Sequence, residues 1–166
     1  MAGKSIEADR APATLAFLLS QVGIHASRRF AERIAELDLH PPLFRVLNLI
    51  DAAEGQSQQA IANAVEVPPS RMVAVVDELE RLGLVERRPH PEDRRVRALH
   101  LTRKGRGVLD RGRRIAAEHE RELTRGLSSA DRKCLTRLLQ EIVDEQEIGR
   151  GVHPGLAQRS NGAGSR

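Results

Sequence analysis

The spacing of apolar residues changes at Gly83, and this change constrains the fold more than any other feature of the sequence. Before Gly83, apolar residues recur every three or four positions, which is the period of an α-helix. After it, in LVERR and again in VRALHLT, the period is two, which is typical of a β-strand. The sequence therefore predicts two short strands, joined through PHPEDR as a hairpin, inside an otherwise helical chain.

Four helical segments are expected before the hairpin. The first covers residues 13–37 and the second 42–53, because the two prolines between them cannot continue one helix but can open the next. Ser57 is placed to cap a short third helix. The fourth covers 69–82, and the glycine that follows it is a suitable C-cap.

Two further helical segments are expected after the hairpin. Thr102 is placed to cap a long fifth helix that ends near Leu123, although its three glycines argue against a regular geometry. Ser128, with an acidic residue three positions later, forms a capping box that opens the sixth helix. The ends of the chain, residues 1–12 and 149–166, show no periodicity and are predicted to be flexible and disordered, respectively.

A short helix, a turn, a second helix and a two-stranded hairpin follow one another in the order of a winged helix-turn-helix. We expect this module at about residues 42–101, within one mainly helical domain spanning 13–148. The helix at 69–82 would fit the major groove of DNA, and the hairpin would reach a neighbouring minor groove. The flanking segments 13–38 and 102–148 are expected to be dimerisation helices, because a monomer could not bury their apolar stripes.

Basic residues gather in and after the hairpin. Residues 86–114 contain eleven Lys and Arg against four Asp and Glu, a net charge of +7, whereas the whole chain carries +4. Most basic residues at the start of the fifth helix are expected to form a solvated face, with Arg103 and Lys104 nearest the DNA. The chain has no Trp or Tyr on which single-stranded bases could stack, so duplex DNA is favoured. A solvated loop explains the charge of the hairpin tip equally well, and only the helix pair upstream favours DNA.

The segment LGLVERRPHPEDRRVRALHLTRKG, at residues 82–105, resembles the wing signature of the MarR family of bacterial transcription regulators. In that signature a DxR pair marks the wing tip and LTxKG leads into the next helix. A looser resemblance covers residues 15–146 and includes VVDELERLGLV. The resemblance implies a triangular homodimer in which the first and the last two helices of each chain intertwine. It also implies that Asp93 and Arg95 are the DxR pair and that Arg95 enters the minor groove.

The predicted recognition helix departs from the common pattern of the resembled family, which has small polar and basic residues in its first two turns. Base hydrogen bonding is therefore expected mainly from Ser70 and Arg71, while Val73 and Ala74 can contact thymine methyl groups. Gln58 is expected to contact phosphate or base, and a solvated helix residue is an equally good interpretation. The predicted DNA contacts are thus Gln58, Ser70, Arg71, Val73, Ala74, Asp93, Arg94, Arg95 and Arg97.

Many members of the resembled family bind a small, often aromatic or phenolic acid between the dimer helices and the winged module, and then release DNA. The resemblance implies a pocket lined from the first, second and fifth helices, with His25, Arg29, Phe44 and Ile115 as candidates. For each of the four, a plain structural role is the stronger interpretation. Cys134 lies on the apolar side of the sixth helix, where a thiol is typically inert, so thiol sensing is disfavoured.

The sequence does not support catalysis, a metal or a cofactor. The six histidines fall in separate segments without metal-ligand spacing, and no phosphate-binding glycine loop is present. No apolar run is long enough to span a membrane, so we expect a cytoplasmic protein. The predicted function is a homodimeric, sequence-specific regulator, in particular a repressor, that binds a palindromic operator in double-stranded DNA and is relieved by a small-molecule effector. The alternative is a helical dimerising module that binds another protein and reads no DNA sequence.

Overall fold

The computed structural model describes residues 13–64, 67–90 and 95–148, and both predicted terminal segments lie outside these residues. The fold is mainly helical with one antiparallel hairpin, as the sequence predicts. The elements are α1 (Leu15–Ile34), the short 3-10 helix η1 (Ala35–Leu37), α2 (Pro41–Ala52), α3 (Gln58–Ala64), α4 (Pro69–Arg81), β1 (Val85–Pro89), β2 (Arg97–Leu101), α5 (Arg103–Leu123) and α6 (Ser129–Glu145).

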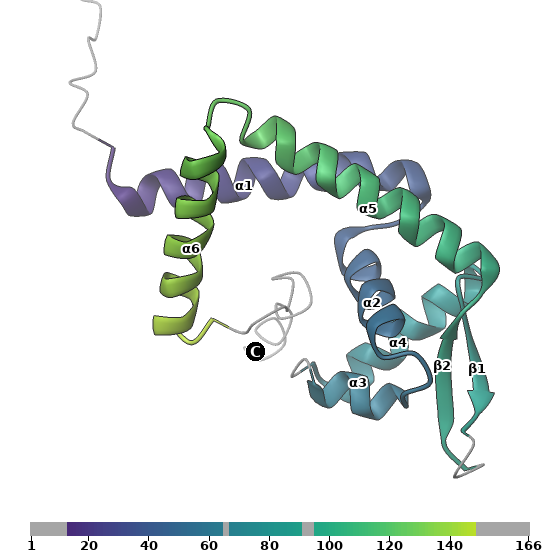
Figure 1. Cartoon of the computed structure of the whole chain (residues 1–166). Helices are drawn as coiled ribbons and strands as arrows, with labels where there is room; N and C mark the ends of the chain where they lie inside the picture. Colours follow the sequence, from purple (N-terminus) through teal and green to yellow (C-terminus); the bar gives the residue numbers. More distant parts are fainter. Residues whose placement is uncertain (1–12, 65–66, 91–94, 149–166) are drawn as a thin grey trace, which may run out of the picture.

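The elements form a pair of long helices and a winged module beneath one end of that pair. Helices α1 and α5 lie side by side, with α2 beneath one end of the pair (Figure 1). Around α2 gather α3, α4 and the hairpin of β1 and β2, which together form the winged module. Helix α6 turns back from the far end of α5, so it lies away from the winged module (Figure 1).

The hydrophobic core lies in the winged module and in the part of α1 and α5 next to it. Helices α2, α3, α4 and α5, the end of α1 and both strands direct apolar side chains into this space. The side chains of the core with no more than 3% exposure include Ile34, Leu43, Val46, Leu47, Ile50, Ile61, Met72, Val76, Leu79, Leu84, Val85, Leu99, Leu101 and Leu109. Because each such side chain contributes roughly 1.5–3 kcal/mol when buried, this core fixes the recognition elements relative to one another.

Local signals in the sequence correctly located several helix ends. Ser57, Thr102 and Ser128 each accept a hydrogen bond from the backbone N–H three residues later, at 3.1, 2.9 and 3.1 Å. Gly83 follows α4 with φ at +69°, a left-handed conformation that favours glycine at the end of a helix. The first helix is shorter than predicted, because η1 follows it and Asp38 takes a left-handed conformation with φ at +55°.

The glycines of α5 required a correction. They were expected to disturb the helix, but α5 is continuous from Arg103 to Leu123. A Cβ atom on Gly105 would lie 1.9 Å from the carbonyl oxygen of Leu84, and one on Gly112 would lie 2.5 Å from the Cε2 atom of Phe44. These two glycines therefore allow α5 to pack closely on the winged module.

The apolar faces of α1 and α6 are exposed in the single chain. No residue of α6 is buried. Leu15 is 67% exposed on α1 and Leu138 is 43% exposed on α6. Cys134, also on α6, is exposed. The further exposed apolar residues of the two helices are Phe17, Leu18, Leu19, Val22, Ile24, Leu135, Leu139 and Ile142.

Candidate nucleic-acid interface

Helix α4 presents one face to the core and one to solvent. Met72, Val76 and Leu79 are buried, so the residues between them in the helical period point outward. The outward face carries the residues that the sequence analysis chose for readout. Ser70, Val73 and Ala74 are exposed, and Arg71 is half-buried. The start of α4 thus offers a hydroxyl group and two small apolar side chains, with a guanidinium beside them.

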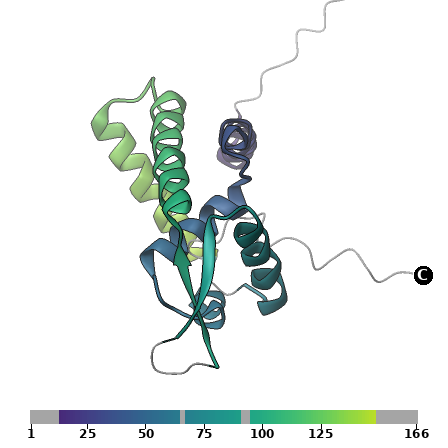
Figure 2. The same cartoon turned by 90° about the vertical axis from the view of Figure 1, so that its right-hand side faces the viewer.

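The hairpin forms the wing. Its strands are antiparallel, with Val85 opposite Leu101 near the core and Pro89 opposite Arg97 at the outer end. The hairpin projects beyond α3 and α4 in both views (Figures 1 and 2). Arg95 and Arg97 are exposed at this outer end, while the predicted contacts Asp93 and Arg94 lie outside the described residues.

Arg87 is a residue of this region that the sequence analysis did not select. From the middle of β1, its guanidinium donates to Oδ1 of Asp77 at 2.5 Å and to Oε1 of Gln58 at 3.0 Å, and it also forms an ion pair with Glu80. The only signal in the sequence was the spacing of Asp77 and Glu80, which puts two carboxylates on neighbouring turns of α4. Gln58, predicted as a DNA contact, therefore has a partner within the protein.

The basic residues at the start of α5 are exposed, as the sequence predicts for a solvated face, but several of them also bind other parts of the protein. Arg113 donates to Oδ2 of Asp51 at 2.7 Å, and Arg106 donates to Oε1 of Glu54 at 2.5 Å. The hydrogen bond from Arg106 lowers the pKa of Glu54, so this carboxylate keeps its charge to more acidic pH than an ordinary glutamate. Lys104, expected nearest the DNA, donates from Nζ to the carbonyl oxygen of Leu82 at 2.8 Å. These contacts attach α5 to α2 and to the end of α4.

The four predicted effector contacts lie in different surroundings. His25 and Arg29 are exposed on α1, whereas Phe44 and Ile115 are half-buried on α2 and α5. Phe44 packs near Phe30, with the ring centroids 5.8 Å apart. The structure therefore brings Phe44 to the junction of α1, α2 and α5, and it leaves His25 and Arg29 on the surface of α1.

His119 belongs to this junction and was missed by the sequence analysis. Its ring lies 5.7 Å from that of Phe30, between centroids. Burial lowers the pKa of His119, and the positive charge of Arg33 acts in the same direction. Arg33 itself donates to Oε1 of Glu122 at 2.6 Å. The only sequence signal for His119 was its position one turn after Ile115 on the same face of α5.

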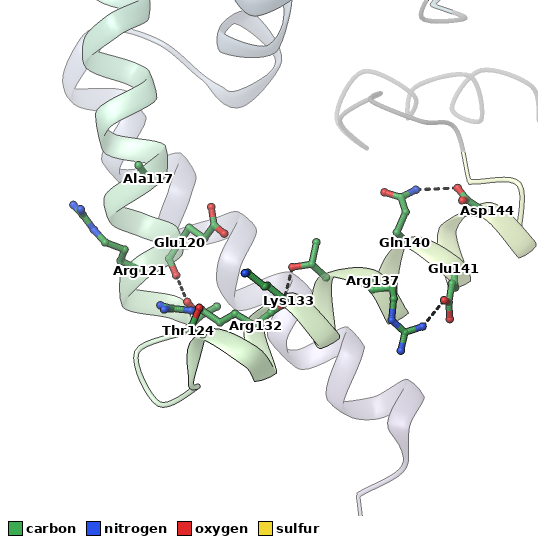
Figure 3. Close-up of a pocket in the computed structure, with 12 residues that line it drawn as sticks. Ala117, Glu120, Arg121, Thr124, Arg132, Lys133, Arg137, Gln140, Glu141 and Asp144 are labelled. Atoms are coloured by element: carbon green, nitrogen blue, oxygen red, sulfur yellow. Dashed lines mark hydrogen bonds and ion pairs between the residues drawn. The ribbon is translucent and has the colours of Figure 1, made fainter.

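Within the described part of the chain, two cavities lie away from this junction, and none of the four predicted effector contacts lines either. One, of about 910 Å³, lies in the angle between α5 and α6, among polar side chains such as Glu120 and Lys133 (Figure 3). The other, of about 500 Å³, lies between α1 and α6 and is mainly apolar. Its apolar lining consists of Leu15, Leu19, Leu135, Leu138, Leu139 and Ile142.

Comparison with known proteins gives consistent matches. The sequence profile of the MarR family matches residues 37–96. The transcriptional regulatory protein for the hcr operon of Thauera aromatica is 32% identical over 148 residues, which cover 84% of this chain and 89% of that protein. The solved structure of the repressor CouR bound to a 23-mer DNA duplex is 35% identical with a TM-score of 0.70, and the match covers 78% of this chain and 92% of CouR.

A second structure, of CouR from Rhodococcus jostii RHA1 bound to p-coumaroyl-CoA, is 30% identical with a TM-score of 0.64. That match covers 76% of this chain and 90% of CouR. Within the described residues, no helix is long and apolar enough to cross a lipid bilayer.

An exposed helix face beside a projecting basic hairpin defines the class of protein as a winged helix-turn-helix transcriptional regulator that binds DNA. The predicted fold class is therefore confirmed. The chain belongs to the MarR family. The matching relatives are regulators and not enzymes, and they favour the regulator over the interaction module.

Proposed function

We propose that this regulator is a homodimeric repressor that occupies a palindromic operator near the genes it controls and leaves it when a small effector binds. The main observation behind the proposal is that the outward face of α4 lies beside the wing. This arrangement allows α4 to enter the major groove of a duplex while the wing reaches the adjacent minor groove. The DNA complex of CouR, a repressor of similar fold, supports it. The proposal includes no catalytic step or cofactor, and it places the protein in the cytoplasm, where bacterial DNA is.

The proposed roles of the DNA contacts follow from their positions. Ser70 and Arg71 hydrogen-bond base edges in the major groove, and Val73 and Ala74 contact thymine methyl groups there. Gln58 contacts a phosphate at the edge of the same groove. The wing residues, of which Asp93 and Arg94 lie outside the described part of the chain, enter or border the minor groove. They are Asp93, Arg94, Arg95 and Arg97.

The proposed dimer explains the exposed apolar faces of α1 and α6. In a two-fold dimer, the same surface of each chain pairs with its copy or with a neighbouring face of the partner. Such pairing would cover side chains like Leu15 and Leu138, which are 67% and 43% exposed in the single chain. The two winged modules would then lie at opposite ends of the dimer, and each would contact one half of the operator. Because the two modules are identical and related by a two-fold axis, the two halves of the operator must form a palindrome.

The proposed effector is an aromatic acid or its coenzyme A thioester. The structure of CouR with p-coumaroyl-CoA supports this class, because CouR resembles this chain over most of its length. Phe44 and Ile115 offer apolar surface to a ring at the junction of α1, α2 and α5. His25 and Arg29, which lie one turn apart on α1, can bind an acidic group. An effector held between α1 and the winged module would change the separation of the two recognition helices.

The first expected result is that the protein shifts a duplex from the region upstream of its own gene in a gel, and that excess random duplex does not displace it. Specific regulators typically bind their site at least about 1,000-fold more tightly than random DNA, which is why the competitor should fail. The same complex, mixed with aromatic acids or their thioesters, should release DNA when the effector is present. If random duplex displaces the upstream duplex as well as the upstream duplex itself does, the alternative of a helical protein-interaction module is favoured instead.

The second expected result is that Arg71→Ala narrows the difference in affinity between operator and random DNA. A bidentate contact to guanine provides about 1–3 kcal/mol of discrimination, which this substitution removes. The matched control is Arg81→Ala, because Arg81 is exposed at the other end of the same helix. Binding constants for both duplexes, measured by fluorescence anisotropy, give the ratio. If Arg71→Ala weakens binding to both duplexes alike, Arg71 contacts phosphate and not bases.

A further inference from the structure

Arg87 joins three elements of the winged module at one guanidinium group. It lies in the middle of β1, opposite Leu99 of β2, and its side chain is 22% exposed. Its donors reach Asp77 and Glu80 on α4 and Gln58 on α3. The wing, the recognition helix and the helix before it therefore share a single charged contact.

The two carboxylates that bind Arg87 lie close to the face of α4 proposed to enter the major groove. Asp77 follows Val73 by four positions and Ala74 by three, so it lies one turn further along the same face. Its side chain is 57% exposed, and that of Glu80 is 43% exposed. A carboxylate at this place approaches the phosphates that border the groove, and like charges repel. Arg87 supplies the positive charge that compensates the pair.

Arg87 also determines how Gln58 is oriented. A guanidinium has donors and no acceptor, so the oxygen of the Gln58 amide, and not its nitrogen, must face Arg87. The Nε2 group is consequently held on the other side of the amide. This group is the hydrogen-bond donor that a phosphate oxygen requires.

We propose that Arg87 is a positioning residue for DNA binding. It neutralises Asp77 and Glu80 beside the groove, it orients the amide of Gln58, and it holds β1 against α4, so that wing and recognition helix approach DNA as one unit. Arg87 acts through these side chains and does not itself contact DNA. The inference rests on the proposed function. It adds a residue whose effect on DNA binding can be measured apart from the effects of the residues that contact DNA.

The experiment compares three variants with the wild-type protein on the operator duplex found in the gel assay. They are Arg87→Met, the neutral pair Asp77→Asn with Glu80→Gln, and the combination of all three changes. Arg87→Met should weaken binding on the order of tenfold, because it leaves the negative charges of Asp77 and Glu80 uncompensated beside the proposed groove face. The neutral pair alone should bind no more weakly than the wild type. The triple variant should recover most of the loss.

This recovery separates positioning from a merely structural role. Because both carboxylates of these ion pairs are exposed, the pairs should contribute little to folding stability, and the unfolding temperature should change little in every variant. If Arg87 only stabilised the fold, Arg87→Met would lower the unfolding temperature together with DNA binding. Wild-type affinity in Arg87→Met, or a triple variant as weak as Arg87→Met, overturns the proposal. A wild-type protein that prefers no duplex overturns the proposed function, and this inference with it.

Discussion

Replacing Arg95 with alanine is expected to weaken operator binding by about 1–3 kcal/mol, the typical value of a good specific contact. The side chain is exposed at the outer end of the wing, so its loss leaves the core of the winged module intact. A narrow minor groove has a strongly negative potential that attracts an inserted guanidinium. The expected loss is therefore one of affinity and not of folding.

The measurement of the Arg95→Ala effect is a titration of labelled operator, with circular dichroism and light scattering as controls for helix content and dimer mass. Arg111→Ala is the matched control, because Arg111 is also exposed but lies on α5, outside the wing. Both variants lose one positive charge. Equal affinity in Arg95→Ala and wild type contradicts the role assigned to Arg95, and an equal loss in both variants shows that only the total charge matters.

The parts of the fold that could be predicted depend on short-range signals. A hydroxyl side chain caps the N-terminus of a helix within three residues, so Ser57, Thr102 and Ser128 located their helices correctly. The alternation after Gly83 is equally local, and it placed the hairpin. With the order of the elements known, few arrangements other than a winged module remain.

The parts that could not be predicted depend on which surfaces meet. Gly105 was interpreted as a weakness of α5, and only the 1.9 Å approach of its virtual Cβ to Leu84 shows why glycine is needed. Arg87 binds Gln58, which is 29 positions earlier in the chain, so no local pattern reveals the contact. Likewise His119, and not the predicted His25, lies against the ring of Phe30.

The same limit applies to charge. The excess of basic residues around the wing was interpreted as a field for DNA and a solvated face, but part of it is used within the protein. Arg106 and Arg113 bind carboxylates on or next to α2. A count of charges along the sequence therefore overstates the positive charge available to a duplex.

Leu139→Glu in α6 is expected to convert the protein to a monomer and to abolish specific DNA binding. Leu139 is 37% exposed in the single chain and belongs to the apolar face that the proposed dimer covers. An unpaired carboxylate costs several kcal/mol when it is buried in such an interface, which is more than an interface of this kind tolerates at one position. Light scattering should then give the mass of a single 18.4 kDa chain in place of twice that mass.

DNA binding should fail in the same variant because the dimer links two half-sites about 34–36 Å apart, and each winged module alone binds weakly. Thr136→Glu is the matched control, since it adds the same charge to α6 at an exposed polar position. This control should remain dimeric and give a footprint over both halves of the palindrome. A monomeric wild-type protein, or a Leu139→Glu monomer that still protects a full operator, would show that dimerisation is not what positions the two recognition helices.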